Sequence, residues 1–303
     1  LETKLTSPDA AEYDEFGKSV DISGGVAIVG AYYDQVESIR CGSAYVFRFN
    51  GSSWNYEAKL TGSARQDGDA FGWPVAIDGD TAVVMTQYVG DAYIFRRVGS
   101  SWVEETRMAS IGIAAAIDGD TVVLGPSGGR VRIFRRGAAG WTQLRDIYYW
   151  DYGDHSFGQA VAINGKKVVI GSPYYDNYNG QAVVFQDTSA GGDWSSTSWT
   201  KLSASDAHSS ANPPMFGLAV AIGGTRTLIG AKMDGSKEGA AYLFQQSGQE
   251  WHEQDKLIAS DPASWDYFGR EVSIEENTAL VVKCFTSFGW EGNSGAAYIY
   301  NLP

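Results

Sequence analysis

A short motif recurs along the whole chain and restricts the possible fold more than any other feature of the sequence. Each copy starts with Phe-Gly, and four residues after the Phe an apolar triplet of the Val-Ala-Ile type follows. The copies begin near residues 16, 71, 111, 157, 216 and 268, between 40 and 59 residues apart, and the third is degenerate (Ile111-Gly112). Internal repeats of this period are typical of propellers, solenoids and other repeat arrays.

Each copy continues with the same four segments. The apolar triplet ends in a polar turn such as Asp78-Gly79-Asp80, and a β-branched run ending near Gly-Ala follows. An Ala-aromatic segment such as 44–47 comes next, and then a segment that starts with Trp and usually ends in Lys-Leu, as at 54–60. Asp-Gly at a two-residue connection favours a β-hairpin, and helical periodicity is absent. We therefore predict an all-β fold, a six-bladed β-propeller of four-stranded antiparallel blades.

The two ends of the chain fit a closed arrangement of the blades. The sequence ends on the third strand of the sixth copy, and residues 1–5 form an unassigned outer strand. Counting from Phe268 round the ends to Phe16 gives 51 residues, a normal repeat length, which favours six blades over the alternative of an incomplete seven-bladed protein. We expect one domain over 1–303, with residues 1–5 completing blade six and removing an open sheet edge.

The pattern resembles the FG-GAP repeat of the integrin α-subunit propeller and its bacterial and algal relatives. The resemblance covers essentially the whole chain, and it implies that the Val-Ala-Ile segment is the innermost strand of each blade and the Trp segment the outermost. Integrin-like repeats often carry a calcium loop, Asp-x-Asp-x-Asp-Gly, between the first two strands. Here that connection shrinks to turns such as 78–80 and 164–166, too short to supply the six or more oxygens of a calcium site.

We therefore predict no metal site and no cofactor, with calcium held by acids of other loops as the alternative. Recurrent acids precede Phe-Gly and follow Gly-Ala, and these are expected to hydrogen-bond loop backbones instead. They are Asp14, Asp69 and Asp266 before Phe-Gly, and Asp34, Asp176 and Asp234 after Gly-Ala.

Charge and hydropathy exclude several classes of partner. The net charge of −13 argues against nucleic-acid binding, because phosphates would be repelled. No apolar run approaches the length of about 18 residues that a membrane helix needs. The chain starts at Leu1 instead of Met, which fits a processed or excised product and a removed secretion signal. An extracellular or cell-surface location is the resulting expectation.

The loops leading into the first strand and those between the second and third strands share one end of the blades, here named the top face. These loops are rich in aromatic residues and acids, which suits protein interfaces and also the stacking of sugars. The predicted ligand-binding residues are Tyr148, Tyr149, Trp150, Tyr152, Tyr174, Tyr175, Trp265 and Trp290. The alternative is that many of these rings pack structurally between blades.

A basic stretch coincides with short top loops around the third copy. We expect a notch over blade three there, able to dock an acidic molecule or a sulfated glycan, unless the stretch is a solvated outer edge. The predicted basic patch contains Arg96, Arg97, Arg130, Arg132, Arg135 and Arg136.

Two further sites follow from the predicted topology. Cys41 and Cys284 fall at the top ends of strands in blades one and six, which closure makes neighbours, so we predict a disulfide. Asn50-Gly51-Ser52 is a glycosylation sequon in a predicted turn.

Three functions remain open from the sequence. The first is an extracellular, non-catalytic module that binds a protein partner or copies of itself through the top-face loops. The second is a glycan-binding lectin, and the third is a polysaccharide-active lyase or hydrolase, since fold alone does not exclude catalysis. No catalytic motif is evident: His155, His208 and His252 share no metal-ligand spacing, and a nucleophile elbow is absent.

Overall fold

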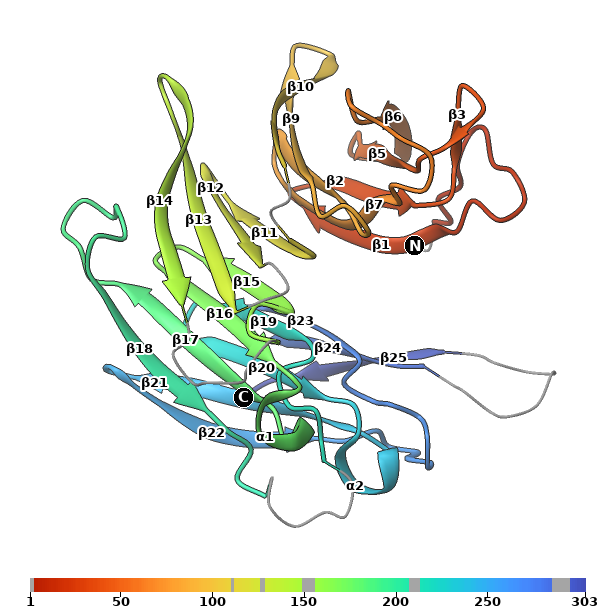
Figure 1. Ribbon diagram of the computed structural model, residues 1–303. Helices are drawn as coiled ribbons and strands as arrows, with labels where there is room; N and C mark the ends of the chain where they lie inside the picture. Colours follow the sequence, from red (N-terminus) through yellow and green to blue (C-terminus); the bar gives the residue numbers. More distant parts are fainter. Residues whose placement is uncertain (1–2, 110–111, 126–128, 149–155, 207–212, 285–294) are drawn as a thin grey trace. The chain divides into compact units, whose positions relative to one another are not determined.

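The structure, a computed structural model, describes residues 3–109, 112–125, 129–148, 156–206, 213–284 and 295–303. These residues form five four-stranded sheets and one three-stranded sheet, one for each copy of the repeat, and the strands within them pair antiparallel (Figure 1). A small hairpin of β3 (Gln35–Val36) and β4 (Ile39–Arg40) is added to the first repeat. The predicted all-β class, a six-bladed β-propeller, is confirmed.

The strands follow the four segments of each repeat. Blades one to three contain β1 (Phe16–Ser23), β2 (Val26–Ala31), β5 (Ser43–Phe49), β6 (Trp54–Leu60), β7 (Phe71–Asp78), β8 (Thr81–Thr86), β9 (Ala92–Val98), β10 (Ser101–Met108), β11 (Ala114–Asp118), β12 (Thr121–Gly125), β13 (Arg130–Gly137) and β14 (Gly140–Tyr148). Blades four to six contain β15 (Ala160–Asn164), β16 (Lys167–Ser172), β17 (Gln181–Asp187), β18 (Thr197–Leu202), β19 (Val220–Gly223), β20 (Arg226–Ala231), β21 (Ala240–Ser247), β22 (Glu250–Leu257), β23 (Glu271–Glu275), β24 (Thr278–Lys283) and β25 (Ala296–Asn301).

The chain divides into two compact units. The first comprises Leu1–Pro126 and Phe134–Thr142, and the second comprises Ser127–Ile133 and Gln143–Pro303. Blades one and two lie in the first unit, blades four to six lie in the second, and the strands of blade three are divided between them. The single domain over 1–303 stays a prediction.

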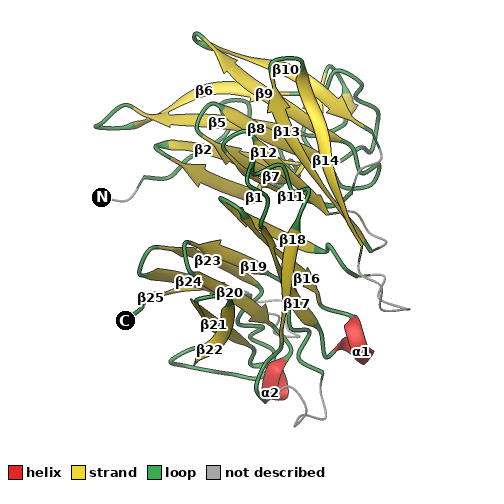
Figure 2. Cartoon of the chain, turned by 90° about the vertical axis from the view of Figure 1, so that its left-hand side faces the viewer, coloured by secondary structure: helices red, strands yellow, loops and turns green. Residues whose placement is uncertain are grey.

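Burial increases from the outer strand of a blade toward its middle. In blade two the second strand, β8, is buried at every residue, whereas the outermost strand, β10, alternates exposed and partly buried side chains. A strand covered on both faces favours a continuous β-branched run, and a half-covered strand favours alternation. Figure 2 shows how little helix accompanies these sheets: α1 (Tyr175–Tyr178) and α2 (Asp234–Lys237) are single turns within loops.

The core lies between successive blades. Val26, Ile28 and Val46 of blade one pack against Val75 and Ile77 from the innermost strand of blade two. Equivalent clusters join blades four and five, and blades five and six. The Phe of the Phe-Gly motif is part of this core and meets aromatic rings of its own blade edge to face, as Phe71 does with Tyr93 at a centroid distance of 5.3 Å.

Glycines of the two motifs meet where neighbouring blades touch. A Cβ on Gly30, from the Gly-Ala end of β2, would lie 1.8 Å from the carbonyl oxygen of Gly72 in the next blade. Gly171 and Gly230 approach the carbonyl oxygens of Gly217 and Gly269 in the same way. The motif is therefore explained by main-chain packing: a side chain at these positions would separate the blades.

The sixth sheet has three strands, in the order β23-β24-β25. Residues 1–5 were expected as its fourth strand, but residues 3–5 carry no strand and residues 1–2 lie outside the described residues. Leu5 is nevertheless anchored, because it packs against the cluster around Tyr45 and Phe47 of blade one. Leu60, at the end of β6, packs in the same way on Tyr93 and Phe95 of blade two. Completion of blade six by the N-terminal segment stays a prediction.

Candidate functional site

Four loops of the second unit are joined side by side by hydrogen bonds. The amide of Met215 donates to the carbonyl of Tyr178 at 2.8 Å, and the amide of Met233 donates to Pro214 at 3.1 Å. The amide of Tyr267 then donates to the carbonyl of Lys237 at 3.2 Å. These bonds connect the α1 loop, the loop before blade five, the α2 loop and the loop before blade six, and Figures 1 and 2 show α1 and α2 on the same side of these blades. We name the joined loops (residues 173–180, 213–217, 232–239 and 263–269) the loop face.

Exposed aromatic rings lie on this loop face. Tyr178 keeps 53% of its surface exposed and Trp265 keeps 39%, while Tyr174 is exposed beside Tyr178 at a centroid distance of 5.3 Å. Three of the predicted ligand residues, Tyr174, Tyr175 and Trp265, lie in these joined loops. Their role in binding stays a prediction.

Lysines cover several of these rings. The Nζ of Lys237 lies 3.4 Å from the ring centroid of Trp265, and the Nζ of Lys201 lies 4.4 Å from that of Tyr175. Lys232 stands 5.7 Å from the ring centroid of Tyr267. Burial lowers the pKa of Lys232, and the nearby Arg270 lowers it further. We expected carboxylates beside the rings, but here cations occupy ring faces on which a sugar would stack.

The remaining predicted aromatic residues are distributed differently. Tyr148, at the end of β14, is exposed, and its ring centroid lies 5.7 Å from the Arg130 guanidinium carbon. The segment 149–155, which follows blade three and its predicted notch, lies outside the described residues. The predicted ligand residues outside the described part are Tyr149, Trp150, Tyr152 and Trp290.

The predicted basic patch does not form one basic surface within either unit. In the first unit Arg97 pairs with Glu57, and Arg136 pairs with Asp120 at 2.6 Å and with Glu105 at 3.4 Å. Arg96 is exposed and Arg135 is partly buried. The other two residues, Arg130 and Arg132, belong to the second unit and share Asp146. Carboxylates therefore neutralise much of the charge that the sequence alone suggested.

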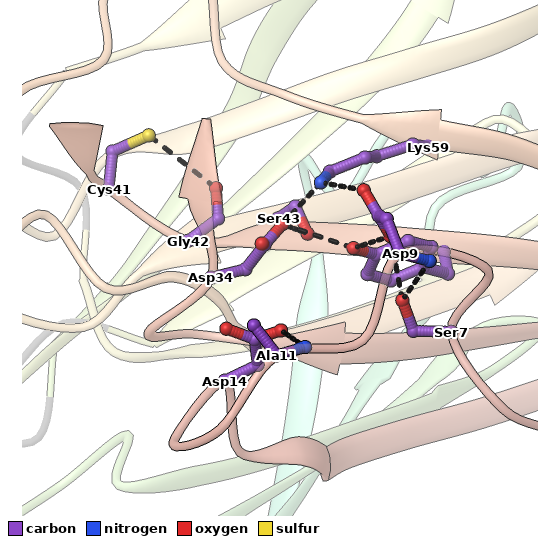
Figure 3. Close-up of polar contacts among 10 residues, drawn as sticks. Ser7, Asp9, Ala11, Asp14, Asp34, Cys41, Gly42, Ser43 and Lys59 are labelled. Atoms are coloured by element: carbon purple, nitrogen blue, oxygen red, sulfur yellow. Dashed lines mark hydrogen bonds and ion pairs between the residues drawn. The ribbon is translucent and has the colours of Figure 1, made fainter. Parts of the chain in front are cut away.

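The acid that follows Gly-Ala in blade one belongs to a compact charged cluster (Figure 3). The Nζ of Lys59 lies 2.6 Å from carboxylate oxygens of both Asp9 and Asp34. The hydroxyl of Tyr45 lies 2.7 Å from Asp9 and 3.1 Å from Asp34, and the hydroxyl of Ser43 donates to Asp34 at 2.5 Å. A lysine ammonium thus stands between two carboxylates, where it neutralises them.

Blade five repeats this cluster almost atom for atom. Lys256 lies 2.6 Å from Asp206 and 2.5 Å from Asp234, and the hydroxyl of Tyr242 lies 2.6 Å and 3.2 Å from the same two carboxylates. Burial raises the pKa of Tyr242, and its hydrogen bond to Asp206 raises it further. The expectation that the acids after Gly-Ala bond to loop backbones needs correction: Asp34 and Asp234 bind lysine and tyrosine side chains. The carboxylate of Asp176 accepts the side-chain amide of Asn179 at 3.1 Å.

The acids before Phe-Gly behave as expected. The carboxylates of Asp14, Asp69 and Asp266 each accept a backbone N–H from the residue three positions earlier, at 2.7, 2.5 and 3.0 Å. Each bond closes the loop that leads into the first strand. Within the described ranges no group of three or more His, Cys, Asp or Glu residues is placed to hold a metal ion.

The first unit carries an aromatic cluster that the predicted ligand residues did not include. Tyr32 lies 5.3 Å from Trp73 and 4.0 Å from Tyr33 between ring centroids. Lys18 stands over Trp73 at 4.8 Å, and Arg40 stands over Tyr33 at 5.4 Å. The sequence signal was the departure of Phe71-Gly72-Trp73-Pro74 from the repeat, since only this copy places Trp and Pro after Phe-Gly.

The predicted disulfide and glycosylation site have different outcomes. Cys41 is buried, Cys284 is partly buried, and both are free thiols, so the structure does not show the disulfide. Asn50 lies in the exposed turn between β5 and β6, where its side-chain oxygen accepts the amides of Ser52 and Ser53 at 2.9 Å. Its accessibility agrees with the prediction, and glycosylation itself stays a prediction.

Comparison with known proteins agrees with this architecture. The sequence pattern of the family described as FG-GAP repeat matches residues 1–47, 54–95, 196–244 and 251–300. No curated protein matches the sequence. Within the described part of the chain, no helix is long and apolar enough to cross a membrane.

Two solved structures are similar to this chain at low sequence identity. The chain is similar to hydrazine synthase from Kuenenia stuttgartiensis, with 10% identity, a TM-score of 0.58, and coverage of 93% of this chain and 79% of that one. It is also similar to Sqt1 from Saccharomyces cerevisiae, with 11% identity, a TM-score of 0.49, and coverage of 95% and 86%. At such identities the likeness to hydrazine synthase concerns the fold alone.

Proposed function

Because this chain belongs to the FG-GAP repeat family, we propose that it is a non-catalytic recognition module that binds a protein partner through the loop face of its second unit. The FG-GAP propeller fold suggests protein interaction, and FG-GAP repeats are typical of extracellular proteins. The observation that carries the proposal is the combination of exposed Tyr174, Tyr178 and Trp265 with the lysines of the same loops.

Aromatic and basic side chains on a supported surface favour protein recognition. Tyr and Trp bury large areas at low entropic cost, and they dominate the binding energy of many interfaces. Lys237 and Lys232 add positive charge to this surface, although the whole chain carries −13. The same loops also carry the acids Asp176, Asp234, Glu238 and Asp266. A complementary partner therefore places carboxylates opposite the two lysines, as an acidic protein or a second copy of this chain does.

Self-association is the most direct test of this proposal. We expect sedimentation velocity over a range of protein concentrations to show an assembly that weakens with added salt and is lost in Trp265→Ala. The matched control is Trp199→Ala, because Trp199 is 60% exposed on the outer strand β18, away from the loop face.

A solid-phase screen against purified acidic extracellular proteins extends the test to other partners. Binding that is lost in Trp265→Ala and kept in Trp199→Ala supports the proposal. Equal loss in both variants, or no binding to any protein including this chain itself, contradicts it.

Glycan binding is the second candidate. It is favoured by Tyr174 and Tyr178, which are exposed and whose rings lie 5.3 Å apart in a tilted pair. A glycan array probed with the wild type and with Tyr178→Ala tests this function. Binding that Tyr178→Ala abolishes would assign the loop face to glycans instead of proteins.

If the protein is extracellular, two covalent modifications are expected: a glycan on Asn50 and a disulfide between Cys41 and Cys284. If the protein is secreted by a eukaryotic cell, Asn50 carries a glycan, which mass spectrometry before and after glycosidase treatment detects. If Cys41 and Cys284 form a disulfide in the secreted protein, a thiol reagent finds no free thiol after unfolding without reductant. Two titrating thiols would remove the disulfide from the proposal.

A further inference from the structure

Blade three departs from a charge arrangement that other blades share. Tyr45 and Lys59 are directly opposite each other on β5 and β6, and Tyr93 and Arg107 are opposite on β9 and β10. Tyr242 and Lys256 occupy the same positions in blade five. In each case a tyrosine of the third strand meets a cation of the fourth strand, and in blades one and five two aspartates complete the group.

In blade three a cation replaces the tyrosine and a carboxylate replaces the lysine. The segment Val131 to Phe134 corresponds to Ala44 to Phe47, which places Arg132 at the position of the tyrosine. Asp146 precedes the buried Ile147 as Lys59 precedes Leu60, so a carboxylate replaces the lysine.

The described residues leave this group short of negative charge. The Nε of Arg130 donates to Asp146 at 3.0 Å, and the Nε of Arg132 lies 3.9 Å from the same oxygen. Two guanidiniums therefore share one carboxylate, whereas in blades one and five two carboxylates share one ammonium. Burial lowers the pKa of Arg132, the neighbouring Arg130 lowers it further, and Asp146 opposes both.

One donor of this group has no acceptor. The Nε of Arg132 is buried and has no hydrogen-bond partner in the described structure, although the side chain as a whole keeps 18% of its surface exposed. A buried N–H without a partner is unfavourable. An added acceptor that approaches the exposed part of the Arg132 side chain gains charge attraction and hydrogen-bond energy. Arg130 lies against the ring of exposed Tyr148, which orients one guanidinium toward an incoming group.

We propose that Arg130 and Arg132 form a binding site for a carboxylate of an acidic protein segment, which adds negative charge where the described residues supply only Asp146 to the two guanidiniums. Planar guanidiniums bind carboxylates through paired N–H···O bonds, so an Asp or Glu side chain is the matching ligand. The site is composed of Arg130 and Arg132 from the start of β13 and of Asp146 and Tyr148 from the end of β14, all of them in the second unit. It does not depend on the loop face, so Trp265→Ala is expected to leave it unchanged.

The test uses a fluorescent oligoglutamate peptide and the full chain, with binding followed by fluorescence anisotropy at low salt. Wild type binds the peptide, and Arg132→Gln weakens binding at least about tenfold, because a charge-assisted hydrogen bond and an ion pair are lost. Arg96→Gln is the matched control: it removes the same charge from an exposed position and changes binding less than about twofold.

A second variant is expected to bind the peptide more tightly than the wild type. Asp146→Asn removes the carboxylate that competes with the peptide, so it strengthens binding several-fold, whereas damage to the fold would weaken it. Weaker binding by Asp146→Asn with an unchanged melting temperature overturns the proposal. Equal losses in Arg132→Gln and Arg96→Gln also overturn it, because they would show attraction without a site. If a sulfated oligosaccharide binds in an Arg132-dependent manner and oligoglutamate does not, the ligand class is wrong.

Discussion

A Cβ on Gly72 would lie 2.3 Å from the carbonyl oxygen of Ser43 in the preceding blade, and the φ of Gly72 is +103°. Close approach and backbone conformation both exclude a side chain there. The Phe-Gly motif was recognisable from the sequence at once, but its contact with the Gly-Ala end of the neighbouring blade was not, because the two glycines are far apart in the chain. Only the structure pairs Gly30 with Gly72.

We expect Gly72→Ala to lower the free energy of unfolding by about 2–4 kcal/mol, from backbone strain and from the displaced carbonyl. Chemical denaturation of both proteins measures the difference. Gly51→Ala is the control: Gly51 has φ +95°, and no atom lies within 4 Å of its added Cβ. Similar losses in both variants would show that strain alone, not blade contact, determines the effect.

The cluster around Lys59 predicts how stability depends on pH. Burial alone would raise the pKa of Asp9, but hydrogen bonds from Lys59, Tyr45 and Ser7 outweigh it and hold the pKa below its usual value. A carboxylate whose pKa is lower in the folded than in the unfolded protein contributes stability above its ordinary pKa, and that contribution disappears as the pH falls toward the folded value.

We therefore expect the free energy of unfolding to decrease as the pH is lowered below about 4. In Asp9→Asn we expect a smaller decrease over the same pH range. Urea denaturation at a series of pH values provides the measurement. Asp255→Asn, at an exposed position of β22, is the control and is expected to leave the slope unchanged. An unchanged slope in Asp9→Asn would mean that Asp9 does not contribute.

At the scale of strands and loops, the sequence was most informative where hydrogen bonding is local. The two-residue turn at Gly79 and the buried run of β8 follow from turn chemistry and β-branched residues. The loop face was only partly predictable, because hydrogen bonds between successive loops, such as Met215 to Tyr178, join residues distant in sequence. Lysines over the rings were missed for the same reason.

The burial pattern predicts an order of hydrogen-exchange protection. We expect the amides of β8 and β2, whose residues are all buried, to exchange far more slowly than those of the outer strand β10. Hydrogen–deuterium exchange followed by mass spectrometry resolves these segments. Equal protection of β8 and β10 would show that a blade opens as one unit instead of from its outer edge.

At the scale of the molecule, the repeat predicted the six blades because each copy reports the same four strands. Closure of blade six was predicted from residue counting alone, and residues 3–5 carry no strand. The segment that follows residues 1–5 nevertheless makes the same contacts as the segment that follows β18. Asp9 bonds to Tyr45 and Lys59 as Asp206 bonds to Tyr242 and Lys256. The sequence showed that blade three departs from the repeat pattern, but only the structure shows that Arg130 and Arg132 share Asp146.

Removal of residues 1–9 is expected to lower the melting temperature by several degrees, because the packing of Leu5 and the hydrogen bonds of Asp9 are lost. The full-length double variant Leu5→Ala/Asp9→Asn separates these side chains from the main chain. A larger loss on truncation than in the double variant supports pairing of residues 1–5 as a strand. Equal losses would contradict that pairing.

The glycine contacts between blades have a consequence for how such a chain changes over generations. Two side chains that fit each other must change together, whereas two stretches of bare main chain fit whatever sequence surrounds them. Gene duplication or exchange of a whole repeat therefore yields a copy that already matches its neighbours. Copies between 40 and 59 residues long coexist in this chain because their length differences fall outside that shared junction, which leaves loops free to diversify toward new partners.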